Sequence, residues 1–288
     1  MKVERFVTNT MVLGECPVWD ERTKTLYWID ITAGQVWGST SENQATMVSS
    51  FDQNVGACCL TKGDGLLVAL EKKIIILDNN KQQVIVDGVE DQLQQNRFND
   101  GKCDPRGRLI IGTMNKNVVP QAGNLYQISP EGDTNVLVEG VTISNGLDWS
   151  PDGKYLYYID TPTGTLWRFL YDEETGTLHD RTPFIDYTQE EGNFDGMCVD
   201  ADGCIWACHW GGFQVTQWDV QSRKKMQTIQ LPVPNVTSCC FGGDNLNQLF
   251  ITTGTGRDES VKRDYPQSGS LYTILTNTRG LPARRFGQ

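Results

Sequence analysis

The chain has 288 residues, of which 38% are hydrophobic, and its 8 Trp, 9 Tyr and 10 Phe can cover a sheet-rich core, which argues against disorder. The formal net charge of −11 disfavours nucleic acid and anionic membranes as partners, because phosphate contacts require basic patches. No apolar run approaches the roughly 20 residues of a membrane span, and MKVERFVTNTM lacks the apolar block of a signal peptide. We therefore expect a cytoplasmic protein.

The predicted elements begin with a short strand, KVERFV, and continue as six copies of one pattern. Each copy is a short apolar strand, a turn built on Asp, Pro or Gly, and a second strand rich in Leu, Tyr, Trp and Ile. The copies are ECPVWDERTKTLYWID, ACCLTKGDGLLVAL, NDGKCDPRGRLIIG, NGLDWSPDGKYLYYID, DGMCVDADGCIWAC and SCCFGGDNLNQLFITT. They start at residues 15, 57, 99, 145, 195 and 238, a spacing close to the period of a four-stranded propeller blade.

Helical solenoids have similar periods, but these units alternate with a period of two residues, are rich in β-branched and aromatic residues, and contain frequent Gly turns. Further strand pairs such as TAGQVWGST and TPTGTLWRFLYDEETG supply the outer half of most units. The sequence therefore predicts an all-β fold: a six-bladed propeller with four-stranded antiparallel blades, forming a single domain over residues 1–288. We expect KVERFV to complete the sixth blade, because closing the ring removes exposed sheet edges.

The first residues of the six units should converge at one end of the central channel, because the innermost strands of a propeller line it. These residues are Glu15, Ala57, Asn99, Asn145, Asp195 and Ser238. The two carboxylates among them would repel each other unless a cation or protons balanced them, and hard divalent cations favour carboxylate and amide oxygen. The alternative is that Asn145 and Asp195 only support turns, since Asn-Gly and Asp-Gly are common turn pairs. The shared register favours the metal site.

The remaining polar candidates are weaker. His179 lies in the polar segment GTLHDR and is expected at the surface, whereas His209 could approach the channel but has no obvious partner. A Ser-His-Asp mechanism is therefore disfavoured. The aspartates Asp104, Asp152 and Asp202 recur in turns and are interpreted as structural.

Nine cysteines, an odd number with two adjacent pairs, predict reduced core residues rather than a disulfide scaffold. Zinc spacing is absent, because Cys204-x3-Cys208-His209 has no second half, so any metal here must use oxygen ligands. The C-terminal ARRFGQ is locally basic and is expected to be solvated.

Five segments, GECPVWDE, RFNDGKCDPRGR, ISNGLDWSPDGKYLYYID, FDGMCVDADGCIW and TSCCFGG, closely resemble the gluconolactonase, senescence-marker-protein (regucalcin) and luciferin-regenerating-enzyme family. The likeness runs nearly end to end, with the motifs in order and at blade spacing. Two segments, ACHWGGFQV and LPVPNVTSCCFGG, are more similar to bacterial sugar lactonases, including xylonolactonase-like and arabinolactonase-like members, than to animal regucalcin.

This resemblance implies a six-bladed propeller that holds one divalent metal. The family's metal ligands fall on Glu15, Asn145 and Asp195. The Arg and Asn of its RxND motif, which is associated with substrate binding, fall on Arg97 and Asn99, and Asn99 is expected to reach the metal only through water.

The loop that follows GTM often helps to cover the substrate in this family. Here it reads Asn115-Lys116-Asn117, without the carboxylate of animal regucalcin-like members. The resemblance therefore gives Asn117 as a substrate-binding candidate and implies a different substrate preference.

We interpret these features as a metal-dependent lactonase acting on a small sugar lactone of the gluconolactone or pentonolactone type. The cation would act as a Lewis acid on the lactone carbonyl while water attacks, and Asp195 is the best general base, although a metal ligand has a lowered pKa. Arg97 and Asn99 could orient sugar hydroxyls or the ring ester. For Arg97 the alternative is a surface salt bridge.

Two other functions remain open: an arylesterase or phosphotriesterase, and a calcium-binding regulatory protein of the regucalcin type. No EF-hand loop is present to support calcium sensing. Ca²⁺ or Zn²⁺ is expected first, and Mn²⁺, Mg²⁺ and Fe²⁺ accept the same ligands. We expect a monomer.

Overall fold

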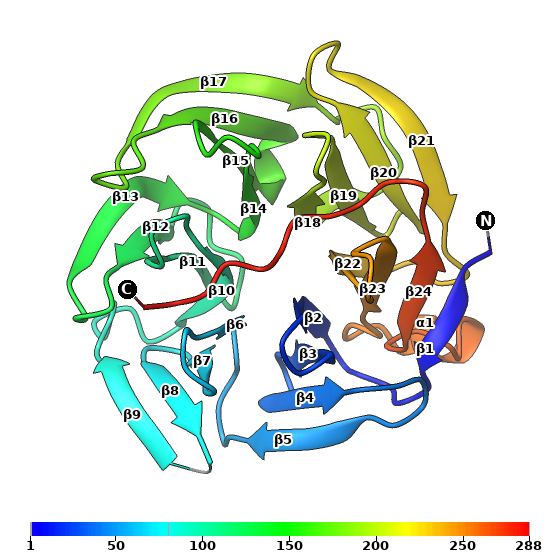
Figure 1. Cartoon of the computed structure of the whole chain (residues 1–288), viewed down its shortest axis with the longest axis horizontal. Helices are drawn as coiled ribbons and strands as arrows, with labels where there is room; N and C mark the ends of the chain where they lie inside the picture. The colour runs from blue at the N-terminus through cyan, green and yellow to red at the C-terminus, as the bar shows by residue number, and fades with distance from the viewer. Residues whose placement is uncertain (1, 80, 288) are drawn as a thin grey trace.

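The structure is a computed structural model that describes residues 2–79 and 81–287. Its strands form six four-stranded antiparallel sheets arranged as blades around a central channel (Figure 1). Blade 1 contains β2 (Gly14–Asp20), β3 (Thr25–Asp30), β4 (Gln35–Ser39) and β5 (Thr46–Ser50). Blade 2 contains β6 (Ala57–Leu60), β7 (Leu66–Ala69), β8 (Ile74–Asp78) and β9 (Lys81–Val86). The predicted six-bladed propeller is confirmed.

The next three blades have the same internal order, from the channel outward. Blade 3 contains β10 (Asn96–Cys103), β11 (Leu109–Asn115), β12 (Gly123–Ile128) and β13 (Thr134–Val141). Blade 4 contains β14 (Ser144–Trp149), β15 (Tyr155–Asp160), β16 (Thr165–Tyr171) and β17 (Leu178–Asp186), with the short 3-10 turn η1 (Thr161–Thr163) between β15 and β16. Blade 5 contains β18 (Asn193–Val199), β19 (Ile205–Trp210), β20 (Gln214–Asp219) and β21 (Lys224–Gln230).

The sixth blade is built from both ends of the chain. Its inner strands are β22 (Val236–Gly242), β23 (Gln248–Thr253) and β24 (Leu271–Leu275), and its outermost strand is the N-terminal β1 (Glu4–Val7). Strand β1 pairs antiparallel with β24, with Glu4 opposite Thr273. The N-terminal strand therefore closes the ring as the sequence predicted.

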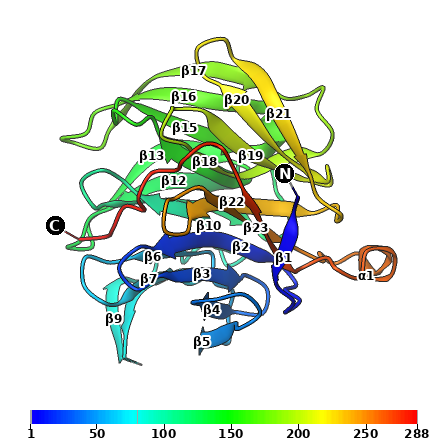
Figure 2. The ribbon, with the colours of Figure 1, turned by 45° about the vertical axis from the view of Figure 1, so that its right-hand side comes forward.

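Aliphatic and aromatic side chains fill the spaces between the blades. One cluster packs Ile29 of blade 1, Leu67 of blade 2 and Ile111 of blade 3 together, all at most 1% exposed. The helix α1 (Glu259–Asp264) lies outside the ring, in the connection between β23 and β24 (Figure 2). Within the part of the chain that the structure describes, no helix is long and apolar enough to cross a membrane.

Carboxylates support the inner hairpins, which confirms the structural interpretation of two of the three turn aspartates. Asp104 accepts hydrogen bonds from the backbone N–H groups of Arg106 (2.9 Å) and Arg108 (2.8 Å), and the Asp152 carboxylate accepts a hydrogen bond from the Ser150 hydroxyl (2.7 Å). In blade 5 the residue equivalent to Asp104 is Asp200 rather than Asp202. Asp104 and Asp200 are equivalent because each lies five residues after the first residue of its unit. Asp200 accepts a hydrogen bond from the backbone N–H of Cys204 at 2.8 Å.

The C-terminal tail packs against the protein, so the expectation of a solvated segment was wrong. In Figure 1 it crosses the end of the channel from β24 toward β10. Phe286 is 2% exposed and exchanges backbone hydrogen bonds with blade 2, donating to Leu60 (2.8 Å) and accepting from Lys62 (2.9 Å). Arg285 forms an ion pair with Asp20. The local positive charge misled the prediction, because this guanidinium is neutralised by a carboxylate of blade 1.

Candidate metal centre

β-Bulges place the predicted site residues. In β10, β14 and β18 the pairing register shifts between Phe98 and Gly101, between Ser144 and Leu147, and between Phe194 and Met197. In each strand two residues therefore oppose one on the neighbouring strand, and the first of the two is Asn99, Asn145 or Asp195. A bulge bends the strand and redirects a side chain, and bulges are frequent beside active sites.

Blade 1 also contains a β-bulge, but there the predicted site residue, Glu15, precedes the two bulged residues instead of being the first of them. The register of β2 changes between Glu15 and Val18, and Cys16, which follows Glu15, has a φ of 49°. Left-handed backbone is costly for a non-glycine residue, so the surrounding fold must hold Cys16 there. By contrast β6, which starts with Ala57, pairs regularly with β7. Strand β22 also shifts register, between Val236 and Ser238. The four predicted donor residues therefore all lie in or beside a bulge, although a bulge is not confined to them.

Glycines at the bulges allow neighbouring blades to approach closely. A Cβ on Gly146 would lie 2.7 Å from the Asp195 carbonyl oxygen and 2.9 Å from the Met197 nitrogen. A Cβ on Gly196 would collide with Ser238 of blade 6. The φ of Gly146 is not positive, so this glycine serves close packing rather than a turn. The interpretation of Asn145-Gly146 as a turn pair is therefore wrong: both residues lie within β14.

Hydrogen bonds join three predicted site residues from two blades. Arg97 Nη1 donates to Asn99 Oδ1 at 2.5 Å, and Asn99 Nδ2 donates to Asn145 Oδ1 at 2.9 Å. The Asn145 amide nitrogen then donates to the Thr161 hydroxyl at 2.7 Å. Arg97 is only 8% exposed and lies inside this network, so the surface salt bridge considered for it is excluded.

Glu15 and Asp195 are 7% exposed and influence each other electrostatically. Burial and the charges of Asp195 and Asp100 raise the pKa of Glu15 well above its usual value. Burial, followed by the charge of Asp100, does the same to the pKa of Asp195. Burial also lowers the pKa of Arg97 to about 10, against the opposing charge of Glu15. Removing these carboxylates from water is costly without a compensating cation or proton.

This donor set fits a hard divalent cation. Among the described residues, none donates a hydrogen bond to the Asp195 carboxylate, and Glu15 accepts only the backbone N–H of Cys16, at 3.0 Å. Asn145 Oδ1 accepts one hydrogen bond and keeps a second lone pair. In residues 2–79 and 81–287 no group of three or more His, Cys, Asp or Glu side chains is placed to hold a metal. Any such site must therefore combine the two carboxylates with amide oxygen.

Asn117 lies apart from this cluster. It is exposed in the loop after β11, and its backbone N–H donates to Asn115 Oδ1 at 3.0 Å. Within the described residues no hydrogen bond connects its side chain to the cluster. Its role in substrate binding stays a prediction. The adjacent Lys116 forms an ion pair with Glu71 of blade 2 at 3.0 Å.

The base of this loop is organised by Glu90, a buried carboxylate that the sequence analysis missed. Glu90 accepts hydrogen bonds from Asn96 (2.8 Å), Thr113 (3.0 Å), Asn124 (2.8 Å) and the Tyr126 hydroxyl (2.8 Å). Glu90 lies in an irregular connection between blades, and no repeated motif marks it. Its partners become visible only when blade 3 is assembled.

The two histidines lie outside the cluster. His179 is exposed, as expected. His209 is fully buried, and its ring nitrogens are 2.7 Å from the Glu191 carbonyl oxygen and 2.7 Å from the Thr216 hydroxyl. His209 therefore has partners that the sequence did not reveal, and both ring nitrogens have structural contacts.

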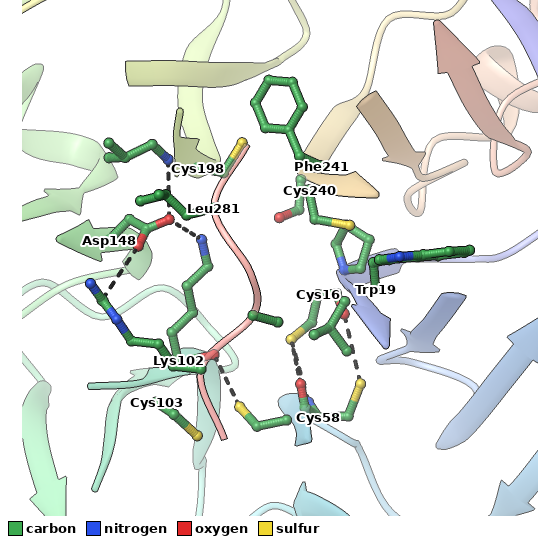
Figure 3. A pocket seen from close by; sticks show the side chains of 18 of the residues that line it. Cys16, Trp19, Cys58, Lys102, Cys103, Asp148, Cys198, Cys240, Phe241 and Leu281 are labelled. Carbon is green, nitrogen blue, oxygen red and sulfur yellow. Dashed lines mark hydrogen bonds and ion pairs between the residues drawn. The ribbon is translucent and has the colours of Figure 1, made fainter. Parts of the chain in front are cut away.

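A cavity of about 100 Å³ lies in the channel between this cluster and the C-terminal tail. Figure 3 shows cysteine side chains around it, with Lys102 pointing to Asp148, at 2.9 Å. Burial raises the pKa of the Cys198 thiol, and a protonated thiol is a poor metal ligand. All nine cysteines are free and eight are buried, as predicted. Asp100 also lines the cavity, and burial raises its pKa to about 6.

A six-bladed propeller with buried oxygen donors at one end of its channel is the class that the fold and site define. The chain belongs to the family described as SMP-30/gluconolactonase/LRE-like, whose model matches residues 13–255. Regucalcin from Xenopus laevis is 36% identical over 281 residues, covering 95% of this chain and 94% of that protein. Regucalcin from Homo sapiens is 34% identical with the same coverage.

Solved structures agree with this membership. A luciferin-regenerating enzyme superposes with a TM-score of 0.93 at 28% identity, covering 100% of this chain and 99% of that chain. Regucalcin from Agrobacterium tumefaciens, described as a calcium-binding protein, also has a TM-score of 0.93, at 26% identity and with coverage of 99% and 97%. A gluconolactonase from Xanthomonas campestris, at 21% identity and a TM-score of 0.78 over 95% and 89% of the two chains, shares the fold.

Proposed function

We propose that this protein is a metal-dependent lactonase that hydrolyses sugar lactones, of the gluconolactone or pentonolactone type, to aldonic acids. The observation that carries the proposal is the arrangement of two buried carboxylates and two amides, from four blades, beside one buried arginine. Family membership supports it, because the family description includes gluconolactonase. The cluster combines charge for a cation with directional donors for an oxygen-rich substrate.

In this proposal Glu15, Asn145 and Asp195 hold one divalent cation, with Ca²⁺ or Zn²⁺ expected first and Mn²⁺, Mg²⁺ or Fe²⁺ as alternatives. When bound, the cation supplies Lewis-acid polarisation of the lactone carbonyl. The bulges hold these ligands on separate strands, so the rigid blades rather than flexible loops set the spacing between them.

The other polar groups bind and orient the substrate. Arg97 Nη1 and Nη2 are donors only, and the guanidinium offers directional hydrogen bonds to a ring oxygen or hydroxyl. Asn99 links Arg97 to Asn145, which couples substrate position to ligand position. The Asp195 carboxylate, which receives no hydrogen bond from the described residues, accepts the proton of the attacking water. Asn117 contributes to substrate binding from the exposed loop after β11.

The test is to remove metal with a chelator, restore single cations, and measure the opening of gluconolactone, xylonolactone, galactonolactone and arabinolactone. Asp195→Ala and Glu15→Ala should each lower kcat by about 100-fold or more, because each removes charge at the reacting centre. Asp152→Ala is the matched control, since Asp152 supports the turn between β14 and β15 through the Ser150 hydroxyl. Full activity in the chelated protein, or equal losses in all three variants, would contradict the proposal.

A second function has one specific observation in its favour. The Agrobacterium tumefaciens relative is described as calcium-binding, and the same oxygen cluster could simply hold Ca²⁺ in a regulatory protein. The same assay separates the two functions: tight Ca²⁺ binding without turnover of any of the four lactones would favour the regulatory function. Aryl esters and phosphotriesters added to the substrate panel test the remaining hydrolase alternative.

The proposal also includes the expectations that the protein is a cytoplasmic monomer and that its partner is a small molecule rather than nucleic acid or membrane. Size-exclusion chromatography with light scattering tests whether the protein is a monomer.

A further inference from the structure

Thr161 lies directly behind the proposed metal ligand Asn145. It opens η1, immediately after β15, and its hydroxyl accepts a hydrogen bond from Asn145 Nδ2 at 2.7 Å. The same hydroxyl donates to the carbonyl oxygen of Phe194 at 2.9 Å. Phe194 precedes Asp195, so this one hydroxyl connects the strands that carry two of the three proposed ligands.

The direction of this hydrogen-bonded chain is determined by its two ends. At one end the Arg97 guanidinium can only donate, so Asn99 must present its oxygen to Arg97 and its NH₂ to Ser144 O (2.7 Å) and Asn145 Oδ1 (2.9 Å). At the other end the Phe194 carbonyl can only accept. The Thr161 proton is therefore committed to Phe194, and its oxygen can only accept from Asn145.

Only one orientation of the Asn145 amide satisfies both neighbours. A flipped amide would place its NH₂ against the NH₂ of Asn99 and its oxygen against the acceptor side of Thr161, and both hydrogen bonds would be lost. The flip would also exchange the two ends of the amide, although only the oxygen end is a ligand for a hard cation.

Backbone contacts hold Thr161 itself in place. The Tyr187 hydroxyl donates to the Thr161 carbonyl oxygen at 2.7 Å, and the Tyr187 ring stacks on Phe194 with centroids 4.0 Å apart. The Thr161 N–H donates to Ile143 at 3.2 Å. The hydroxyl therefore has a defined position between blades 4 and 5.

We propose that Thr161 is a positioning residue that orients the Asn145 amide and so sets the affinity of the centre for a divalent cation. The inference rests on the proposed function, because it takes Asn145 as a ligand. Thr161 does not bind the cation; it acts through Asn145. Hydrogen-bond partners of metal ligands typically contribute about 10- to 100-fold to metal affinity.

The experiment measures Ca²⁺ binding to the full chain, stripped with chelator, by isothermal titration calorimetry, and repeats it with Zn²⁺. Thr161→Val removes the hydroxyl at nearly constant shape and should raise the Kd by about 10- to 100-fold. Thr161→Ser restores the hydroxyl and should return the Kd close to that of the unsubstituted chain. If the valine variant does not fold, Thr161→Ala removes the same hydroxyl with a smaller side chain.

Thr163→Val is the matched control within the same turn. Its hydroxyl donates to Asp160 O at 2.7 Å and accepts from Trp167 Nε1 at 3.2 Å, away from Asn145. Thermal denaturation monitors the fold of every variant. A carboxylate has no amide polarity to orient, so in an Asn145→Asp background the cost of Thr161→Val should fall sharply.

The outcomes separate this inference from the proposed function. If the unsubstituted chain binds Ca²⁺ and the folded Thr161→Val variant binds it equally well, Thr161 has no positioning role and the lactonase proposal is untouched. Equal losses in Thr161→Val and Thr163→Val would also overturn the inference, because they would show general loosening of the turn. If the unsubstituted chain binds neither cation, the metal centre itself is wrong.

Discussion

Gly146 lies where the backbones of blades 4 and 5 pass so closely that a side chain would not fit. The packing of these two blades and the geometry of the proposed centre therefore both depend on this glycine. Replacing Gly146 by Ala places a Cβ 2.7 Å from the Asp195 carbonyl oxygen, 2.8 Å from Met197 Cγ and 2.9 Å from the Met197 nitrogen. Two of these three atoms belong to the backbone of β18, which cannot rotate away as a side chain can. Strands β14 and β18 must therefore separate by roughly half an ångström or more to restore ordinary contact.

The magnitude follows from two costs. Overpacking of this kind costs about 1–3 kcal/mol of unfolding free energy. The separation also moves Asn145 away from Asp195, and because displacements near 1 Å can cost about 100-fold in rate, we expect about a tenfold loss in kcat/KM and a similar rise in the metal Kd. Urea unfolding, calorimetric titration of Ca²⁺ and lactone hydrolysis measure the three quantities.

Gly63→Ala is the matched control, because its added Cβ would meet only the Thr61 hydroxyl oxygen, at an ordinary 3.7 Å, and its φ is not positive. We expect no measurable loss of metal affinity there. If Gly146→Ala bound Ca²⁺ as tightly as the unsubstituted chain and kept its stability, the close approach of β14 and β18 would not determine the ligand spacing, and the reasoning would fail.

Two further predictions concern stability. Phe286→Ala should lower the unfolding free energy by about 3–5 kcal/mol, because the ring is 2% exposed; a loss below about 0.5 kcal/mol in urea unfolding would instead support a solvated tail. Burial lowers the pKa of His209 below its ordinary value of 6.5, so at acidic pH the unfolded state takes up a proton that the folded state excludes. The stability that neutral His209 contributes is therefore present above pH 6.5 and is lost as the pH falls below that value. His209→Gln should therefore flatten the loss of stability between about pH 7 and about pH 5, whereas the same substitution of the exposed His179 should leave the slope unchanged.

The register of the repeat was sufficient to predict the ring of blades and the equivalent positions of the four oxygen-bearing residues within it. Counting from the turn glycines aligns Glu15, Asn99, Asn145 and Asp195, and the structure places all four at the bulged starts of innermost strands. The repeat succeeded because each blade buries the same faces, so equivalent positions must occupy equivalent places around the axis.

Groups that belong to no repeat could not be predicted in the same way. Thr161 and Glu90 lie in connections between strands, and their hydrogen-bond partners come from distant segments. Asp100 follows Asn99 in the sequence, yet its influence on Glu15 and Asp195 depends on how blades 1, 3 and 5 meet. Such contacts depend on tertiary structure, and a single sequence without an alignment gives no signal for them.

Asn145-Gly146 shows why local chemistry was ambiguous here. An Asn-Gly pair commonly marks a turn because glycine tolerates a positive φ, but Gly146 has no positive φ and sits within β14. What the position requires is the absence of a Cβ where the backbone of the next blade passes. A turn glycine and a packing glycine look identical in the sequence, and only the repeat, which places a polar residue and a glycine at the same point in blade 5, favours packing. The glycine that allows the two strands to approach therefore also determines how close the strand that carries Asn145 lies to the strand that carries Asp195, as the proposed metal centre requires.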